Sequence, residues 1–151
     1  MRHGEAASGQ EDARRALTPA GRSAVERVAW RVATVGLRPD AIYHSGMLRA
    51  QQTAEILARH LGVANAVRAR EGLQPEDAVE PVAEWLQRQA DEDHAIVVVG
   101  HLPFLDRLAS RLLVGDPHVG VLDFQPGALV KLTPRRGGGF SVSWMLSAGV
   151  V

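Results

Sequence analysis

The chain has 151 residues, of which 46% are hydrophobic and 23% are charged, and Lys plus Arg equal Asp plus Glu at 17 each. The zero net charge excludes nucleic acid or an anionic membrane as a partner held by bulk charge, and the absence of cysteine excludes disulfides, thiolate metal sites and a cysteine nucleophile. The length is typical of one domain, and we expect residues 1–151 to form it.

The sequence offers no candidate for a membrane segment. No apolar run approaches the roughly 18 residues that a membrane span needs, and the N-terminal region is polar and charged, unlike a signal peptide. We therefore expect no membrane association and a cytoplasmic location.

Helix and strand patterns alternate over most of the chain. In the first helix pattern, apolar residues recur on one face, Thr18 and Pro19 mark the start and Gly36 marks the end. The run "AIVVV" is continuously apolar, as in a strand that is buried on both faces. In chain order, the patterns predict a helix over 19–35, a strand over 41–45, a helix over 47–61, a strand over 65–69, a helix over 78–91, a strand over 95–99 and a helix over 102–113.

The last part of the chain has strand patterns alone. The segments "VGVLDF" (119–124), "ALVKLT" (128–133) and "FSVSWMLS" (140–147) are joined by turns, one of them the glycine run 137–139. The whole pattern predicts an α/β fold, a three-layer sandwich with a mostly parallel central sheet, helices on both faces and an antiparallel C-terminal strand pair. Ligands of such sheets bind beyond the carboxyl ends of the strands.

Four polar residues follow the predicted strand ends. Arg2 and His3 stand where a first strand would end, Arg49 lies in the first turn of the helix after 41–45, and His101 follows 95–99. A guanidinium group can bind two oxygens of one phosphate at once. A neutral imidazole is a nucleophile near neutral pH. We expect these residues to bind and attack a dianionic group, with Gly4 allowing a sharp turn close to the ligand.

Other histidines and the tryptophans carry less information. His44 lies at the same edge, where it either lines the rim of the site or faces the helix layer. We expect His60, His94 and His118 to be surface residues, and we expect Trp30, Trp85 and Trp144 to belong to the core. The sequence has no carboxylate cluster and no His-x-x-x-His pair, and we therefore predict no metal and no cofactor.

Four segments, in order, resemble the signature blocks of the histidine phosphatase (phosphoglycerate-mutase-like) superfamily: "RHGEA", "LTPAGR", "HSGMLRAQQTAEIL" and "VVVGHLPFL". The short length, "RALT" at 15–18 and "FSVSWML" look most like the SixA-type phosphohistidine phosphatases. The resemblance implies a phosphoglycerate-mutase-like fold and a covalent phospho-His3 intermediate. It also implies that Arg2, Arg49 and His101 hold the phosphoryl oxygens. Arg15 matches a basic position at the pocket mouth, and we expect Gly4, Arg15 and Ser45 to bind substrate.

One departure from the family pattern concerns the general acid. Mutase-type relatives have a glutamate after the third strand, where this chain has "REGLQPEDAVEP". A phosphate ester needs a proton for its leaving group, whereas a phosphoramidate releases imidazole with less help. The resemblance therefore favours removal of phosphate from phosphohistidine on a phosphotransfer protein, such as a histidine phosphotransfer domain or kinase. Glu71, Glu76 or Asp77 is the alternative, as a displaced acid.

Two other functions remain open at this stage. One is a broad phosphomonoesterase acting on small molecules, and the other is a non-catalytic module that binds phosphate. The second follows from another departure: relatives have an apolar strand before "RHG", whereas only Met1 precedes it here. We expect its absence to weaken the support of His3 and to expose the two neighbouring strands. The oligomeric state stays open.

Overall fold

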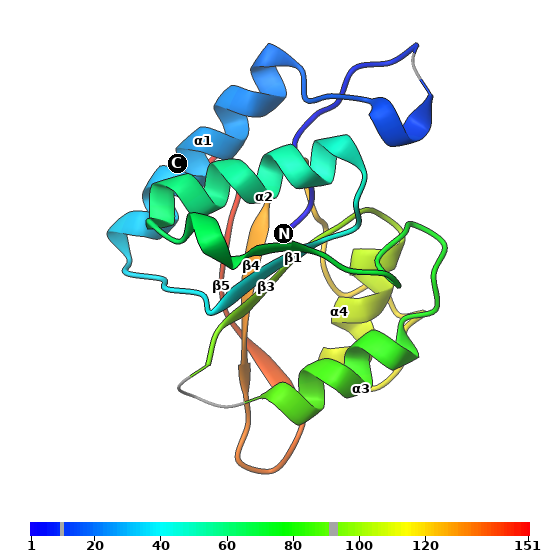
Figure 1. The fold of residues 1–151 in the computed structure, drawn as a ribbon. Coiled ribbons are helices and arrows are strands. Elements are labelled where there is room, and N and C mark those ends of the chain that lie inside the picture. The colour runs from blue at the N-terminus through cyan, green and yellow to red at the C-terminus, as the bar shows by residue number, and fades with distance from the viewer. Residues whose placement is uncertain (10, 91–93) are drawn as a thin grey trace.

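The computed structural model describes residues 1–9, 11–90 and 94–151, and its strands form two sheets (Figure 1). A parallel three-stranded sheet has the order β2-β1-β3, and an antiparallel pair consists of β4 and β5. The strand bounds are β1 Ala41–His44, β2 Val67–Ala69, β3 Ile96–Val99, β4 Leu129–Pro134 and β5 Phe140–Leu146.

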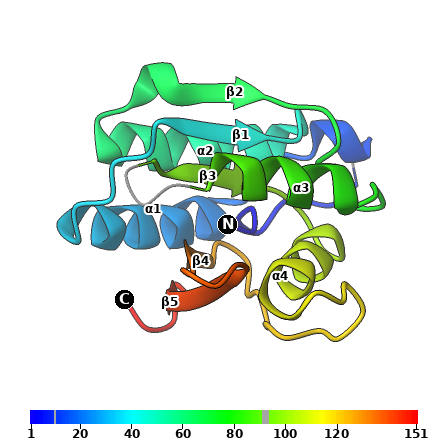
Figure 2. The same cartoon turned by 90° about the horizontal axis from the view of Figure 1, so that it is seen from below.

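Helices cover both faces of the parallel sheet, with α1 and α2 on one side and α3 and α4 on the other (Figures 1 and 2). Their bounds are α1 Pro19–Thr34, α2 Leu48–Leu61, α3 Glu80–Gln89 and α4 Phe104–Val114, with short 3₁₀ turns η1 Asp12–Arg14 and η2 Ala64–Ala66. In β3, Val97 and Val99 join the apolar cluster beneath α1 and α2, while Val98 joins the cluster beneath α3 and α4. The α/β fold with helices on both faces and an antiparallel C-terminal pair is confirmed.

The start of α1 illustrates how local sequence fixes an element. The Thr18 hydroxyl accepts a hydrogen bond from the Gly21 N–H at 2.9 Å, and Pro19 occupies the first turn. Val25, Val28 and Val32, at helical spacing, are fully buried. The capping residue and the apolar face together fix both the start of α1 and its orientation on the sheet.

Two expectations, one about residues 119–124 and one about Trp30, are wrong. Residues 119–124 form no strand, because the N–H groups of Gly120 and Val121 donate to the Ser110 hydroxyl on α4 rather than to a neighbouring strand. Trp30 is 61% exposed instead of belonging to the core. It lies between Ala29 and Arg31 on α1, and the valines of the opposite face take the buried positions.

The segment Met1–His3 takes the place of a first strand, although it is only three residues long. Arg2 forms a parallel bridge with Gly100, the His3 N–H donates to the Gly100 carbonyl at 3.1 Å, and the Gly100 N–H donates to the Met1 carbonyl at 3.1 Å. On the other side, the Arg2 N–H donates to Ala128 at 2.9 Å, and the Gly127 N–H donates to the His3 carbonyl at 3.0 Å. His3 is therefore supported from both sides, and the expected weakening of its support is not observed.

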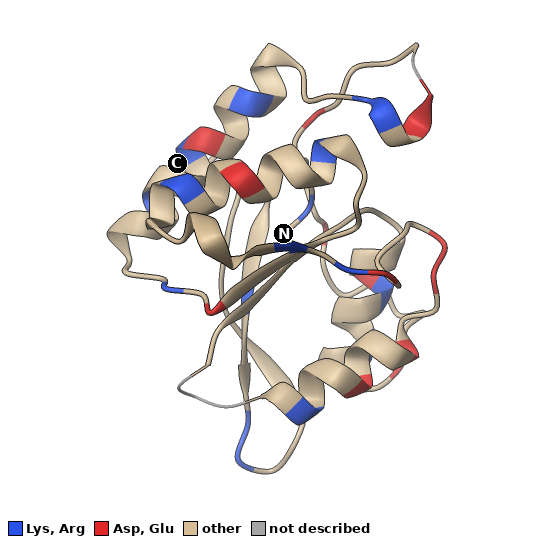
Figure 3. Cartoon of the chain, viewed as in Figure 1, with Lys and Arg blue, Asp and Glu red and all other residues tan. Residues whose placement is uncertain are grey.

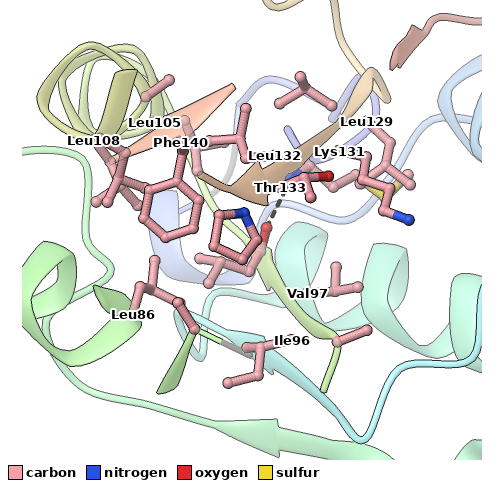
Figure 4. A pocket seen from close by; sticks show the side chains of 18 of the residues that line it. Leu86, Ile96, Val97, Leu105, Leu108, Leu129, Lys131, Leu132, Thr133 and Phe140 are labelled. Atoms are coloured by element: carbon pink, nitrogen blue, oxygen red, sulfur yellow. Dashed lines mark hydrogen bonds between the residues drawn. The ribbon is translucent and has the colours of Figure 1, made fainter. Parts of the chain in front are cut away.

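The two strands next to the short first segment, β3 and β4, have edges that are unpaired in the described residues and that line a cavity. In the described part of the chain, β3 pairs only with β1 and β4 only with β5, and a cavity of about 530 Å³ lies between their unpaired edges. Consecutive residues line it along both strands, 96–98 and 129–134, as expected where a cavity meets strand edges rather than faces. Figure 4 shows Ile96 and Val97 across the cavity from Leu129 and Leu132.

The Met1 amino group lies at the wall of this cavity. It donates to the Val98 carbonyl at 2.7 Å, as a backbone N–H of a continuing strand would. Burial lowers the pKa of this amine to about 5, because the charged form loses its hydration. The amino group therefore satisfies the Val98 carbonyl at the edge of β3 without carrying a full charge near neutral pH.

Charges are distributed over both helix layers, and Lys and Arg alternate with Asp and Glu along the ribbon (Figure 3). This agrees with the net charge of zero. In the described residues, no helix is long and apolar enough to cross a membrane.

We predict that Gly21→Ala destabilises the protein by about 2 kcal/mol or more, the usual scale for overpacking in a core. A Cβ at Gly21 would lie 2.2 Å from the Glu5 carbonyl oxygen, so that α1 and the segment after His3 would have to separate. Urea unfolding of the variant would measure the loss, with Ala20→Gly in the exposed first turn of α1 as the control for a change of helix propensity. Equal stability of wild type and Gly21→Ala would contradict the close packing.

Candidate active site

His3 is held in one orientation by its own backbone neighbourhood. Its Nδ1 lies 2.6 Å from the Gly4 carbonyl oxygen. Since a carbonyl can only accept, Nδ1 carries the proton and Nε2 keeps its lone pair. The backbone hydrogen bonds to Gly100 and Gly127 fix the main chain on either side. The result is a neutral imidazole with a nucleophilic nitrogen in a defined position.

Arg49, in the first turn of α2, reaches this nitrogen. Its Nε lies 3.3 Å from His3 Nε2, and only 5% of its side chain is exposed. The buried Thr53 hydroxyl donates to the Arg49 carbonyl at 2.7 Å and accepts from the Gly4 N–H at 3.1 Å. Thr53 therefore connects α2 to the segment that carries His3, a link that the sequence analysis missed.

His101 faces His3 across the site. The two ring centroids are 4.9 Å apart and the rings are tilted by 51°. His101 Nε2 lies 2.6 Å from the Ser45 hydroxyl, and its buried Nδ1 has no hydrogen-bond partner in the described residues. Ser45 is buried and bonded to His101, so its position suits orienting that ring, while our prediction that it binds substrate stays a prediction.

Both imidazoles titrate well below their ordinary range. Burial, followed by the charges of Arg49, Arg2 and Arg15, lowers the pKa of His3 to about 4, and the hydrogen bond to Gly4 only partly offsets this. Burial, followed by His3 and Arg49, lowers the pKa of His101 to about 3. Both rings are therefore neutral at pH 7, which keeps the His3 lone pair available for attack.

Arg2 and Arg15 add positive charge from two sides. The Arg2 Nη1 donates to the Phe124 carbonyl at 2.7 Å, while its buried Nε has no partner in the described residues. The Arg15 Nε donates to the Ala7 carbonyl at 2.7 Å. The structure thus joins His3, Arg49 and His101 by direct contacts, and Arg2 and Arg15 lie close enough for their charges to lower the pKa of His3. Such a group of cations suits an anion with several oxygens.

Asp12, in η1, is a member of the site that the sequence analysis missed. Its carboxylate lies 3.2 Å from Arg49 Nη2 and 3.1 Å from Arg15 Nη1, and its carbonyl accepts from Arg49 Nη1 at 2.6 Å. Desolvation raises the pKa of this carboxyl, but the hydrogen bonds from Arg49 and Arg15 outweigh it, so the pKa lies below its usual value. The only sequence feature that could have indicated Asp12 is its spacing of three residues from Arg15. Ordinary surface ion pairs have the same spacing, so it does not mark a site.

Gly4 is required for a reason other than the predicted sharp turn. It has no positive φ, and a Cβ there would lie 2.8 Å from Val25 Cγ2 and 2.9 Å from the Gly21 carbonyl oxygen. Close packing against α1 therefore explains the glycine. Whether Gly4 also contacts substrate stays a prediction.

His44 and two of the three candidate acids, Asp77 and Glu76, have contacts of their own. The buried His44 accepts from the Gly46 N–H through Nδ1 at 3.1 Å. Asp77 accepts from the Gln74 N–H at 2.7 Å, and Glu76 lies 3.7 Å from Arg107. Glu71 is exposed. In the described residues no group of three His, Cys, Asp or Glu side chains is placed to bind a metal.

Comparison with known proteins decides the family. The model of the histidine phosphatase superfamily (branch 1) matches residues 1–75. A solved structure of the protein histidine phosphatase SixA with tungstate superposes with a TM-score of 0.88 at 26% identity, over 99% of this chain and 96% of that one. The chain belongs to the histidine phosphatase superfamily. Its fold is that of SixA, and membership supports a phosphatase.

Three relatives by sequence differ in how much they cover. The phosphohistidine phosphatase SixA of Escherichia coli K12 is 28% identical over 97% of this chain and 91% of its own. An uncharacterised protein of Picosynechococcus sp. is 40% identical over 77% of this chain and 72% of its own. Human PGAM5, a mitochondrial serine/threonine-protein phosphatase, is 36% identical over 64% of this chain, and the match spans only 35% of that relative's length.

We predict that His3 and His101 remain neutral down to about pH 4 and about pH 3, respectively. The unfolded chain binds protons on the same rings below about 6.5, so the unfolding free energy falls as the pH drops from 6.5 through this window. An NMR titration of the imidazole Cε1–H signals would measure both values. Midpoints at or above those of the urea-unfolded chain would contradict the burial and charge arguments.

Proposed function

We propose that this protein is a phosphohistidine phosphatase that removes the phosphoryl group from phosphohistidine on a phosphotransfer protein through a phospho-His3 intermediate. The observation that carries the proposal is the state of His3. Its Nδ1–H donates to Gly4, and its unprotonated Nε2 accepts from the Arg49 Nε–H on the side of the ring that faces His101. Membership of the superfamily and the likeness to SixA support the same reaction.

The first step forms the intermediate. His3 Nε2 attacks phosphorus, the bond from phosphorus to the substrate nitrogen breaks, and its electron pair remains on that nitrogen. The Gly4 carbonyl holds the proton on Nδ1 and stabilises the positive charge that the phosphorylated ring acquires. Arg2, Arg49 and His101 bind the phosphoryl oxygens as negative charge is redistributed among them. Water then attacks phospho-His3, releases phosphate and restores the free imidazole.

The available acids favour a P–N bond over an ester. An alkoxide leaving group needs a protonated acid at the site. The one carboxylate beside Arg49 in the described residues, Asp12, is ionised by its two arginines, and Asp77 and Glu76 are engaged in other contacts. Imidazole is a far better leaving group, and its departure needs no such acid.

The position of Asp12 favours a protein substrate. Asp12 is 57% exposed while Arg49 is 5% exposed, so Asp12 lies on the solvent side of the buried guanidinium. A phosphorylated side chain on a folded partner can approach the site from this side. The human PGAM5 relative, whose name specifies a serine/threonine-protein phosphatase, makes phosphoserine the competing protein substrate.

We predict that the wild-type protein becomes labelled on His3 by a ³²P-phosphohistidine protein, and that the label is acid-labile, as P–N bonds are. His3→Ala should abolish both label and turnover, because no other nucleophile lies at that position. His118→Ala, at an exposed position far along the chain, is the matched control and should retain both. Quench-flow with acid-stable and acid-labile counting would measure the intermediate.

Substrate preference separates the remaining functions. Turnover is compared on a phosphohistidine protein, a phosphoserine protein and a sugar phosphate. A preference for either ester would overturn the phosphohistidine proposal in favour of a serine phosphatase or a broad phosphomonoesterase. Phosphate binding without label or turnover on any of them would leave a non-catalytic binding module.

A further inference from the structure

Asp12 lies on the far side of Arg49 from the His3 nitrogen that attacks phosphorus in the proposed reaction. The Arg49 guanidinium lies between two groups, since its Nε contacts His3 Nε2 at 3.3 Å and its Nη2 contacts the Asp12 carboxylate at 3.2 Å. The carboxylate is thus separated from the nucleophilic nitrogen by one guanidinium. It also lies on the solvent side, with 57% of its side chain exposed against 5% for Arg49. An in-line attack requires the leaving group to depart on the side of phosphorus opposite to His3 Nε2, and we take the solvent side, where Asp12 lies, as that side.

The same carboxylate competes with a bound phosphoryl group. Phosphoryl oxygens held by Arg49 need the N–H groups that Asp12 now accepts from through its carbonyl and Oδ2. On binding, the carboxylate keeps Arg15, at 3.1 Å from Oδ1, and loses a charge-assisted hydrogen bond from Arg49. An ionised carboxylate that loses such a donor next to another anion is unfavourable, unless the substrate brings a donor of its own.

Leaving groups differ in whether they bring that donor. The protonated ring of a phosphohistidine carries an N–H on the nitrogen that is not phosphorylated, together with a positive charge. The leaving oxygen of a phosphate ester carries no hydrogen and becomes negative as the bond breaks. A carboxylate at the mouth attracts the first and repels the second.

Resting on the proposed function, we propose that Asp12 is a specificity-determining residue that selects phosphoryl groups whose leaving group is a protonated imidazole. Its carboxylate accepts the N–H of the substrate ring once the phosphoryl oxygens have taken Arg49. His3 Nε2 then forms the new bond to phosphorus, and the electron pair of the broken P–N bond stays on the leaving nitrogen. The ring leaves as neutral imidazole and keeps its N–H, so no proton has to be supplied.

The test compares two small substrates that differ in the leaving group, N-phosphoimidazole and 4-nitrophenyl phosphate. In Asp12→Asn, the ratio of kcat/KM for the first to that for the second should fall at least about tenfold, the factor expected for one hydrogen bond to a charged group. Asp12→Glu, which keeps the charge, should restore most of the ratio. Glu11→Gln is the matched control, because the exposed Glu11 pairs with Arg14 at 3.6 Å outside the site, and it should leave the ratio unchanged.

Competitive inhibition by inorganic phosphate supplies a second readout. Phosphate should bind more tightly to Asp12→Asn, because the competing carboxylate is gone, and this binding also shows that the variant retains a folded site. If both substrates change by the same factor, Asp12 merely competes for Arg49 and the specificity proposal is overturned while the phosphatase proposal stands. If the wild type does not turn over N-phosphoimidazole or a phosphohistidine protein, both proposals fail.

Discussion

The site depends on the backbone pairing of three residues. Met1, Arg2 and His3 lie between Gly100, at the end of β3, and residues 127–128, before β4, and the hydrogen bonds on both sides link the two sheets at this point. The other parts of the site are placed relative to this paired segment. Gly4 packs on α1, Thr53 connects Gly4 to α2, and His101 follows Gly100 directly. Because the linkage is made of backbone groups, it does not depend on the Arg2 side chain, whose Nη1 donates to the Phe124 carbonyl and whose Nε has no partner in the described residues.

The chemistry follows from keeping two imidazoles neutral among arginines. Burial is the largest contribution to the lowered pKa of both His3 and His101, and the nearby cations add to it. A protonated ring there would be desolvated and repelled by its neighbours, so the lone pair on His3 stays free at neutral pH. In the proposed reaction, the same arginines that lower these pKa values attract the phosphoryl group, whose negative charge then favours hydrogen bonds from both the arginines and His101. One set of charges would thus serve both the nucleophile and anion binding.

Local signals in the sequence predicted most of the fold and the centre of the site. The helices and the parallel strands are marked by period and by capping residues, as in Thr18 and Pro19 of α1, and the strand-end rule placed His3, Arg49 and His101 at one edge. The rest depends on tertiary contacts. Residues 119–124 have a strand pattern, yet Ser110 on α4 takes their N–H groups. Thr53 and Asp12 lack any distinctive spacing, and Gly4 and Gly21 are fixed by the distance between α1 and the strand-end segment, which only the packed fold defines.

Asp12 changes how the missing general acid is understood. The resemblance of the sequence to the family favours a P–N substrate because the glutamate of mutase-type relatives has no counterpart in "REGLQPEDAVEP". The structure adds a carboxylate on the solvent side of Arg49, and hydrogen bonds from Arg49 and Arg15 hold its pKa below the usual value. In the proposed reaction this anion lies beside the leaving group. A negative charge in that place disfavours a leaving group that becomes negative and favours one that carries an N–H. The proposed preference for imidazole then follows from a group that is present, in a position set by η1 and held by Arg49.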